Sequence, residues 1–202
     1  MNRIGKSIAA LACSVFLSSC LTVTADKLAK VTPDQIQTKG APRVKMFTRW
    51  AGNIANAHDK ELVDVIEGSI HKYKFEKLVR SLGCCLVVEG PTEADVIIDA
   101  KVNGEQKPLA LFFAVLTGVS LYILPSWIHS ELDWEVQVTA KGASQSYKLF
   151  DSLLLVQWLP LVVAVPFHDT PAELEQKMVE NAYLNLLLKM KQDGFLGTMN
   201  NT

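Results

Sequence analysis

The side chains that most often carry catalysis are thinly spread along this sequence of 202 residues. The four histidines do not fall in the HxxxH or HExxH spacing that places two zinc ligands on one helix face, and no GxSxG segment forms a nucleophile elbow. The glycines are scattered and build no phosphate-binding loop, and no carboxylate pair stands out. The four histidines are His58, His71, His129 and His168. The sequence therefore predicts a protein that is not an enzyme and that uses no cofactor or metal.

Cysteine is the residue type whose position suggests a chemical modification. Arg3 and Lys6 precede an apolar stretch from Ile8 to Leu17, and small residues then lead to Cys20. A short positive segment, about ten apolar residues and small residues together are typical of a secretory signal peptide, and this apolar stretch is too short to span a bilayer. An ordinary secretory signal that happens to end near a cysteine is the alternative.

The segment Leu17-Ser18-Ser19-Cys20 resembles the lipobox of bacterial lipoproteins. In that family a diacylglyceryl group is attached to the thiol, the signal peptide is cut before the cysteine, and the new amino group receives a further acyl chain such as palmitate. The resemblance implies that residues 1–19 are removed and that Cys20 is the lipidated anchor, which three acyl chains make stable. Leu21 stands where enterobacterial lipoproteins kept in the inner membrane carry Asp, so the resemblance implies the periplasmic face of the outer membrane.

The remaining thiols are Cys84 and Cys85, because Cys13 lies in the predicted signal peptide. Adjacent residues of an extended segment point to opposite faces of a sheet, so a bridge between them would strain the backbone and the disulfide. We expect one to be buried as a small apolar residue and the other to be a free thiol. An intermolecular disulfide is the alternative.

Two apolar blocks interrupt the soluble-looking part of the chain, at Leu109–Ile128 and Ser152–Phe167. At about 1.5 Å per residue the first could just cross a hydrocarbon core as a helix, whereas the second is shorter and contains two prolines. Three interpretations remain open: lobes that dip into one leaflet, ordinary core, and a transmembrane hairpin. We favour the lobes and expect these side chains to contact the membrane: Leu111, Phe112, Phe113, Tyr122, Trp127 and Trp158.

The elements that must position these residues follow from hydrophobic periodicity. Alternation predicts strands at 43–50, 84–89, 95–103, 131–141 and 145–150, and the helical period predicts helices over 59–82 and from the capping box at Thr170 to Gly194. The first helix is expected to bury the stripe formed by Leu62, Ile66, Ile70, Tyr73, Phe75, Leu78, Val79 and Leu82. The sequence thus predicts an α+β fold, a mainly antiparallel or mixed sheet with two helices on one face and both apolar blocks emerging at one edge.

The predicted organisation is a signal peptide over residues 1–19, a lipidated tether over residues 20–42, and a single α+β domain over residues 43–197. A formal net charge of -1 and the absence of a basic run argue against nucleic acid as a partner. The apolar blocks, with Leu124-Pro125 and Trp158-Leu159-Pro160, are similar to segments of uncharacterised proteobacterial envelope lipoproteins, a resemblance that implies no activity.

The function expected from these features is that of a non-catalytic, lipid-anchored envelope protein on the periplasmic face of the outer membrane. Its partners would be membrane lipid and an envelope protein complex, in envelope assembly or integrity. The alternative is an inner-membrane subunit whose transmembrane hairpin associates with a transport complex. The sequence names neither the partner protein nor the oligomeric state.

Overall fold

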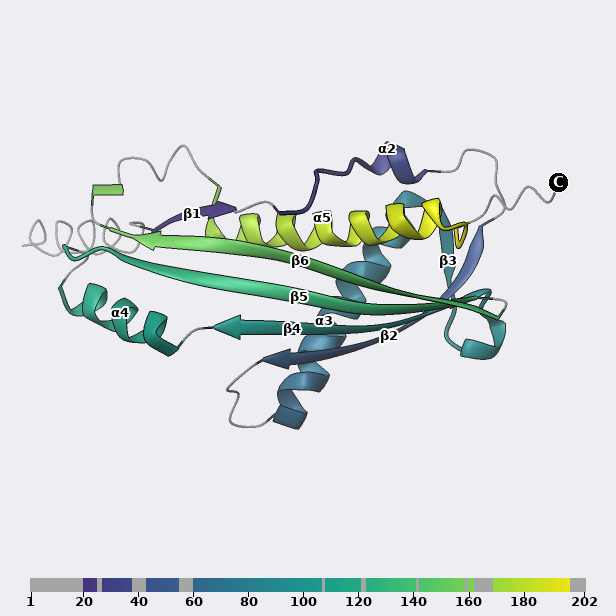
Figure 1. Ribbon diagram of the computed structural model, residues 1–202, viewed down its shortest axis with the longest axis horizontal. Coiled ribbons are helices and arrows are strands. Elements are labelled where there is room, and N and C mark those ends of the chain that lie inside the picture. Colours follow the sequence, from purple (N-terminus) through teal and green to yellow (C-terminus); the bar gives the residue numbers. More distant parts are fainter. Residues whose placement is uncertain are drawn as a thin grey trace, which may run out of the picture. The chain divides into compact units, whose positions relative to one another are not determined.

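The computed structural model describes residues 20–24, 27–37, 43–54, 60–106, 108–120, 123–140, 142–158, 160–161 and 169–196 (Figure 1). The predicted α+β fold with a mixed sheet and packed helices is confirmed. In chain order the elements are β1 (Cys20–Thr24), α2 (Pro33–Ile36), β2 (Val44–Ile54), α3 (Lys60–Leu82), β3 (Cys85–Val87), the short 3₁₀ helix η1 (Pro91–Glu93), β4 (Val96–Gln106), α4 (Pro108–Val119), β5 (Ser126–Ala140), β6 (Ala143–Gln157) and α5 (Pro171–Gln192).

The chain divides into two compact units. We call residues 1–26, 106–131 and 152–177 the lobe unit, and residues 27–105, 132–151 and 178–202 the core unit. The elements β5, β6 and α5 each contribute residues to both units. The domain boundaries inferred from the sequence stay a prediction.

The strands hydrogen-bond in the order β1-β6-β5-β4-β2-β3. In the core unit β2 is parallel to both β3 and β4, with Val44 opposite Cys85 and Met46 opposite Val96. In the lobe unit β1 is antiparallel to β6. Between β5 and β6 the chain turns at Gly142, whose φ of 85° lies in the left-handed region that glycine adopts at little cost.

One face of the sheet in the core unit is buried and carries both long helices. The predicted alternation along β5 is confirmed, since Trp134, Val136 and Val138 are buried. The indole ring of Trp50, on β2, lies 5.2 Å from the ring of Phe75 on α3 and 5.5 Å from the ring of Tyr183 on α5, measured between centroids. Both helices therefore pack on the same side of β2, as the sequence predicts.

The buried face of α3 matches the predicted one only toward the end of the helix, where Phe75, Val79 and Leu82 are buried. The side chains of Ile66, Ile70 and Tyr73 are 48%, 40% and 68% exposed, so the prediction that they are buried is wrong. The physical reason is a close approach between the helix and β2, in which a β-carbon on Gly68 would lie 2.5 Å from the carbonyl oxygen of Trp50. The residues that do face the sheet start at this glycine and follow at helical spacing: Gly68, His71, Phe75, Val79 and Leu82.

Within the segment predicted as a tether, residues 20–24 form β1 and residues 27–37 pack on α5. Val31 and Ile36 are buried, and the backbone N–H of Val31 donates to Oδ1 of Asn181 at 3.1 Å. The side-chain amide of Asn185 donates to the carbonyl of Ala29 at 2.8 Å. The side chains of Asn181 and Asn185, on α5, thus satisfy backbone groups of residues 27–37. These residues therefore belong to the core unit and are not a free spacer.

His71 is buried among aromatic rings in the core unit. Its Nδ1 shares a hydrogen bond of 2.6 Å with the hydroxyl of Tyr183, and its ring stacks on Trp50 with the centroids 6.1 Å apart. Burial, together with a smaller effect of the charge of Lys74, lowers the pKa of His71 from 6.5 to about 4. The neutral imidazole is therefore the form that the core holds at neutral pH.

The close approach of α3 to β2 at Gly68 predicts how one added methyl group changes the free energy of unfolding. Gly68→Ala places a β-carbon against the backbone of Trp50 and Ala51, so we expect the free energy of unfolding to fall by about 1–2 kcal/mol, measured by urea denaturation. Gly118→Ala, in α4, is the matched control, because no atom lies within 4 Å of its added carbon. Helix propensity should make that control neutral or slightly stabilising. Equal effects of the two substitutions would contradict the role of Gly68.

The lowered pKa of His71 predicts acid sensitivity. Above its unfolded pKa of 6.5 the imidazole is neutral in both states, and as the pH falls toward about 4 the unfolded state binds the extra proton. From about pH 7.5 to about pH 5 the free energy of unfolding should therefore decrease by roughly 2 kcal/mol through this group.

The control for this prediction is His71→Phe, which keeps a ring in the cluster but cannot titrate. Urea denaturation of both proteins at the two pH values measures the slope. We expect the variant to be less stable at neutral pH, because Tyr183 loses its hydrogen bond to the imidazole, but to lose less stability on acidification. An unchanged pH slope would show that another group causes the acid sensitivity.

Candidate membrane-contact site

The lobe unit brings the predicted lipidation residue next to the ends of β5 and β6. Cys20, the first residue of β1, is paired with Gln157, the last residue of β6 (Figure 1). The side chain of Gln157 accepts a hydrogen bond of 3.1 Å from the hydroxyl of Ser126, the first residue of β5. Trp127 and Trp158 directly follow Ser126 and Gln157 in the chain, so the register of β1 places the anchor residue beside both strand ends.

Helix α4 presents an apolar surface in the same unit. It has twelve residues, and the sequence from Pro108 to Ser130 contains no Asp, Glu, Lys or Arg. Large apolar side chains are exposed along the helix and in the loop that follows: Phe112 58%, Phe113 51%, Val115 57%, Leu116 39%, Val119 78%, Ile123 66% and Leu124 54%. Exposed apolar side chains that are grouped in this way mark a surface for lipid or protein contact.

The polar groups at the end of α4 are satisfied locally. The hydroxyl of Thr117 donates to the carbonyl of Phe113 at 3.0 Å, and the hydroxyl of Ser120 donates to the carbonyl of Thr117 at 2.9 Å. Ser120 also accepts the backbone N–H of Leu124 at 3.2 Å. Because lipid offers no water to unpaired backbone groups, this pairing lowers the free-energy cost of placing the end of the helix in an apolar phase.

The first apolar block does not form one helix of twenty residues. The helix ends at Val119, and from Ser126 the chain is part of β5. At about 1.5 Å per residue α4 is roughly 18 Å long, short of the roughly 30 Å of a hydrocarbon core. Among the described residues no helix is long and apolar enough to cross a membrane.

The second apolar block is also divided. Its residues from Ser152 to Gln157 form the end of β6, and Ser152 and Leu153 are buried. Trp158, just beyond the strand, is 41% exposed. Residues 159 and 162–167 of this block lie outside the described residues.

The predicted contact residues have the following positions. Phe112, Phe113, Trp127 and Trp158 are exposed in the lobe unit, with Trp127 at 66%. Leu111 lies in α4 and Cys20 in β1, but their side chains, and the whole of Tyr122, are outside the described part. The sequence analysis missed Val115, Leu116, Val119, Ile123 and Leu124; the signal that could have identified them is the lack of charge on every side of this helix.

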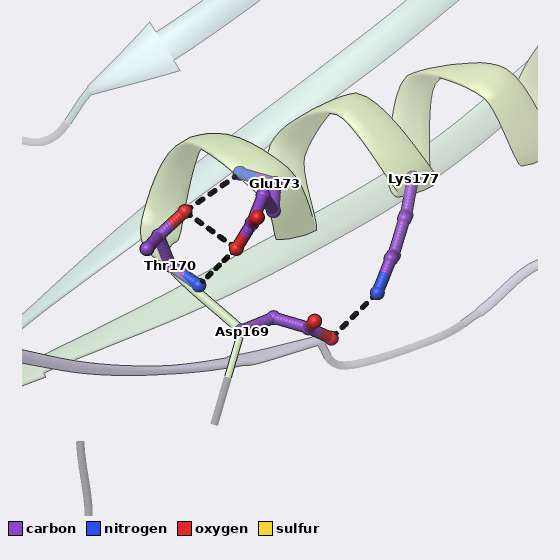
Figure 2. Close-up of polar contacts among 4 residues, drawn as sticks. All are labelled: Asp169, Thr170, Glu173 and Lys177. Atoms are coloured by element: carbon purple, nitrogen blue, oxygen red, sulfur yellow. Dashed lines mark hydrogen bonds and ion pairs between the residues drawn. The ribbon is translucent and has the colours of Figure 1, made fainter. Parts of the chain in front are cut away.

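The part of α5 in the lobe unit begins at the predicted capping box, which Figure 2 shows. The hydroxyl oxygen of Thr170 accepts the backbone N–H of Glu173 at 3.3 Å, and the carboxylate of Glu173 accepts the backbone N–H of Thr170 at 2.8 Å. Hydrogen bonds from the backbone and side chain of Thr170 lower the pKa of Glu173. The ammonium of Lys177 lies 2.7 Å from the carboxylate of Asp169. These paired charges fix the start of the helix and contrast with the uncharged α4.

The polar face of the sheet in the core unit holds a groove of about 480 Å³, and four of the five charged side chains that line it form ion pairs. The guanidinium of Arg49 donates to the carboxylate of Asp99 at 2.9 Å, and Lys148 lies 2.9 Å from Glu135. The hydrogen bond from Lys148 lowers the pKa of Glu135, so this carboxylate is ionised at neutral pH. No group of three or more metal-ligating side chains occurs among the described residues. The chemistry that these side chains show is therefore that of ion pairs.

No protein-family model matches this chain, and no curated protein is similar to it in sequence. Among solved structures it is similar to a PelC dodecamer from Paraburkholderia phytofirmans, with 8% identity, a TM-score of 0.35, and coverage of 83% of this chain and 98% of that one. It is also similar to the hypothetical protein CT253 from Chlamydia trachomatis, with 8% identity, a TM-score of 0.34, and coverage of 77% and 98%. With TM-scores this low, the function has to be argued from the residues of the chain itself.

Proposed function

We propose that this protein is a non-catalytic, lipid-anchored envelope protein that lies on the periplasmic face of the outer membrane. In this proposal Cys20 carries the acyl chains, and the exposed apolar side chains of the lobe unit enter the same leaflet. The observation that supports it best is the pairing of Cys20 with Gln157, because this register puts the anchor residue in the unit that contains α4, Trp127 and Trp158.

The chemistry of the lobe unit supports shallow insertion of the lobe into one leaflet. A helix of about 18 Å that is apolar on every side matches the depth of one leaflet better than the thickness of a bilayer. The indole rings of Trp127 and Trp158 have an apolar body and a polar N–H, the combination that favours the boundary between headgroups and acyl chains. Each large exposed side chain that enters the lipid contributes about 1 kcal/mol or more.

The same residues indicate which force drives the contact. Because no Lys or Arg lies between Pro108 and Ser130, attraction to anionic headgroups is not part of it. Binding should therefore depend on apolar burial and respond little to salt. A protein held in this way is suited to envelope assembly or integrity, in which a periplasmic domain has to remain at one membrane surface.

Separating the two membranes of cells tests the anchor. We expect the wild-type protein in the outer membrane and Cys20→Ala mostly in the soluble periplasmic fraction, because the lobe alone lacks the acyl chains that make the attachment stable. Recovery of the wild type in the inner membrane would contradict the proposed location. A Cys20→Ala variant that stayed fully in a membrane would contradict the proposed role of acylation.

Binding to vesicles tests the lobe. In the Cys20→Ala background, the triple variant Phe112→Ser, Val119→Ser and Trp127→Ser should bind vesicles of phosphatidylethanolamine and phosphatidylcholine roughly a hundredfold more weakly, measured by cosedimentation.

The matched control for the lobe replaces an equal number of exposed apolar residues in the core unit, with Ile66→Ser, Ile70→Ser and Tyr73→Ser on α3. We expect this control to bind vesicles as the parent does, and both variants to keep the far-ultraviolet circular dichroism of the parent. Equal losses from the two triple variants would show that exposed hydrophobicity in general, and not the lobe, determines binding.

A further inference from the structure

Cys84 and Cys85 lie together at the junction between α3 and β3. Both are free thiols, but the expectation that only one of them is buried is wrong, because each is 4% exposed. The alternation of a strand does not apply to this pair, since β3 begins only at Cys85 and Gly83, with a φ of 66°, turns the chain just before Cys84. The result is a distance of 3.0 Å between the two sulfur atoms.

The two thiols differ in acidity. The thiol of Cys85 donates a hydrogen bond to the sulfur of Cys84. This hydrogen bond lowers the pKa of Cys84, with a smaller contribution from the charge of Lys191, and it raises the pKa of Cys85, which burial raises as well. Since the thiolate is the nucleophile in disulfide exchange, Cys84 is suited to attack and Cys85 to resolve.

We propose that Cys84 and Cys85 form a redox-active dithiol that a protein disulfide or glutathione disulfide oxidises to a vicinal disulfide. The sulfur atoms, now 3.0 Å apart, need to approach to about 2.05 Å. This inference goes beyond the proposed function, and its oxidation in the cell rests on the periplasmic location proposed there, an oxidising compartment.

The reaction is a two-step exchange. The thiolate of Cys84 attacks one sulfur of the incoming disulfide, forms a mixed disulfide and releases one thiolate of the oxidant. Cys85 then loses its proton and attacks the sulfur of Cys84, and the second thiolate of the oxidant leaves. Two electrons pass to the oxidant, which becomes two thiols and takes up the two protons that Cys84 and Cys85 have lost.

Access to the buried pair follows from its place in the sheet. β3 has only three residues and is the last strand in the order of the sheet, with β2 as its partner. Edge strands that are this short separate from their neighbour at a small fraction of the free energy of global unfolding. Gly83, which precedes the pair, has no atom within 4 Å of the position where a β-carbon would lie, so the chain has room to move there.

The expected disulfide is easily reduced. Adjacent α-carbons are about 3.8 Å apart across a trans peptide, below the usual range of about 4.4–6.8 Å for bridged cysteines. Strain of this kind raises the reduction potential and makes a bridge labile. The ratio of thiols to disulfides in the compartment therefore determines whether the pair is reduced or oxidised, and the disulfide does not act as a permanent crosslink.

The test equilibrates the full-length, detergent-solubilised protein with defined ratios of reduced and oxidised glutathione, then blocks free thiols by alkylation and digests with trypsin. The peptide Ser81–Lys101 contains both thiols and no other cysteine, so its mass reports on the pair alone. We expect the peptide, in oxidising mixtures, to lose about 2 Da, the mass of two hydrogen atoms, with no alkyl group added. The protein should keep its near-ultraviolet circular dichroism.

The variants Cys84→Ser and Cys85→Ser are the controls, because neither can lose two hydrogens from this peptide. We expect Cys85→Ser to accumulate a mixed disulfide with glutathione faster than Cys84→Ser, as the lower pKa of Cys84 requires. The proposal is overturned by a peptide with two alkyl groups at every ratio, by two glutathione adducts, by a link to a second chain, or by loss of the native spectrum on oxidation.

A second measurement separates this proposal from the proposed function. Acid-trapped cells show the state of the same peptide before extraction. Oxidation of the purified protein together with full alkylation in cells would contradict the periplasmic location and leave the thiol chemistry standing. Oxidation in both supports the two proposals together.

Discussion

The contact of Trp50 with both long helices is the interaction on which the core unit depends. One indole ring on β2 lies against Phe75 of α3 and Tyr183 of α5, so the position of each helix constrains that of the other. The edge of the Tyr183 ring also faces the ring of Phe75, with the centroids 5.3 Å apart. Edge-to-face contacts of this kind stabilise a pair beyond the burial of its area, and they fix the rotation of each helix about its axis.

The rotation of α3 about its axis determines which of its apolar residues are exposed. When Gly68 and Phe75 face the sheet, the apolar residues Ile66, Ile70 and Tyr73 must lie on the outer side of α3. Glycine at the point of closest approach lets the backbone of the helix reach the strand, which a larger residue would prevent. The burial of His71 on the same side then requires partners for a polar ring, and Tyr183 and Trp50 supply them.

The sequence predicted the parts of the fold that rest on local patterns. Alternation along β5 identified its buried residues, and Thr170 with Glu173 identified the start of α5, because a capping box satisfies backbone groups within one turn. The failures share a different cause. The face of α3, the packing of residues 27–37 on α5 and the proximity of the two thiols at Cys84 all depend on tertiary contacts. Hydrophobic periodicity predicted that the most apolar stripe of α3 is buried, whereas close packing buries the stripe that contains the smallest residue, Gly68.

In the candidate site, the sequence identified the apolar block but did not predict that it is divided between a helix and a strand. A run of twenty residues without charge has the length of a transmembrane helix, yet from Ser126 on the block belongs to β5, and the hydroxyl of Ser126 donates to Gln157 of β6. The pairing of Cys20 with Gln157 could not be read from the sequence either, because β1 and β6 are far apart along the chain.

That last pairing determines how an anchor and a lobe act together. If Cys20 were followed by a free spacer, the acyl chains and α4 would bind lipid as nearly independent groups. With β1 hydrogen-bonded to β6 from Cys20 to Thr24, Cys20 and α4 belong to one compact unit. If Cys20 carries the proposed acyl chains, their insertion holds the exposed side chains at a high effective concentration near the same leaflet. A contact that is too weak to bind a membrane alone then adds to the total affinity. The anchor already accounts for the translational and rotational entropy that is lost when the protein binds the membrane.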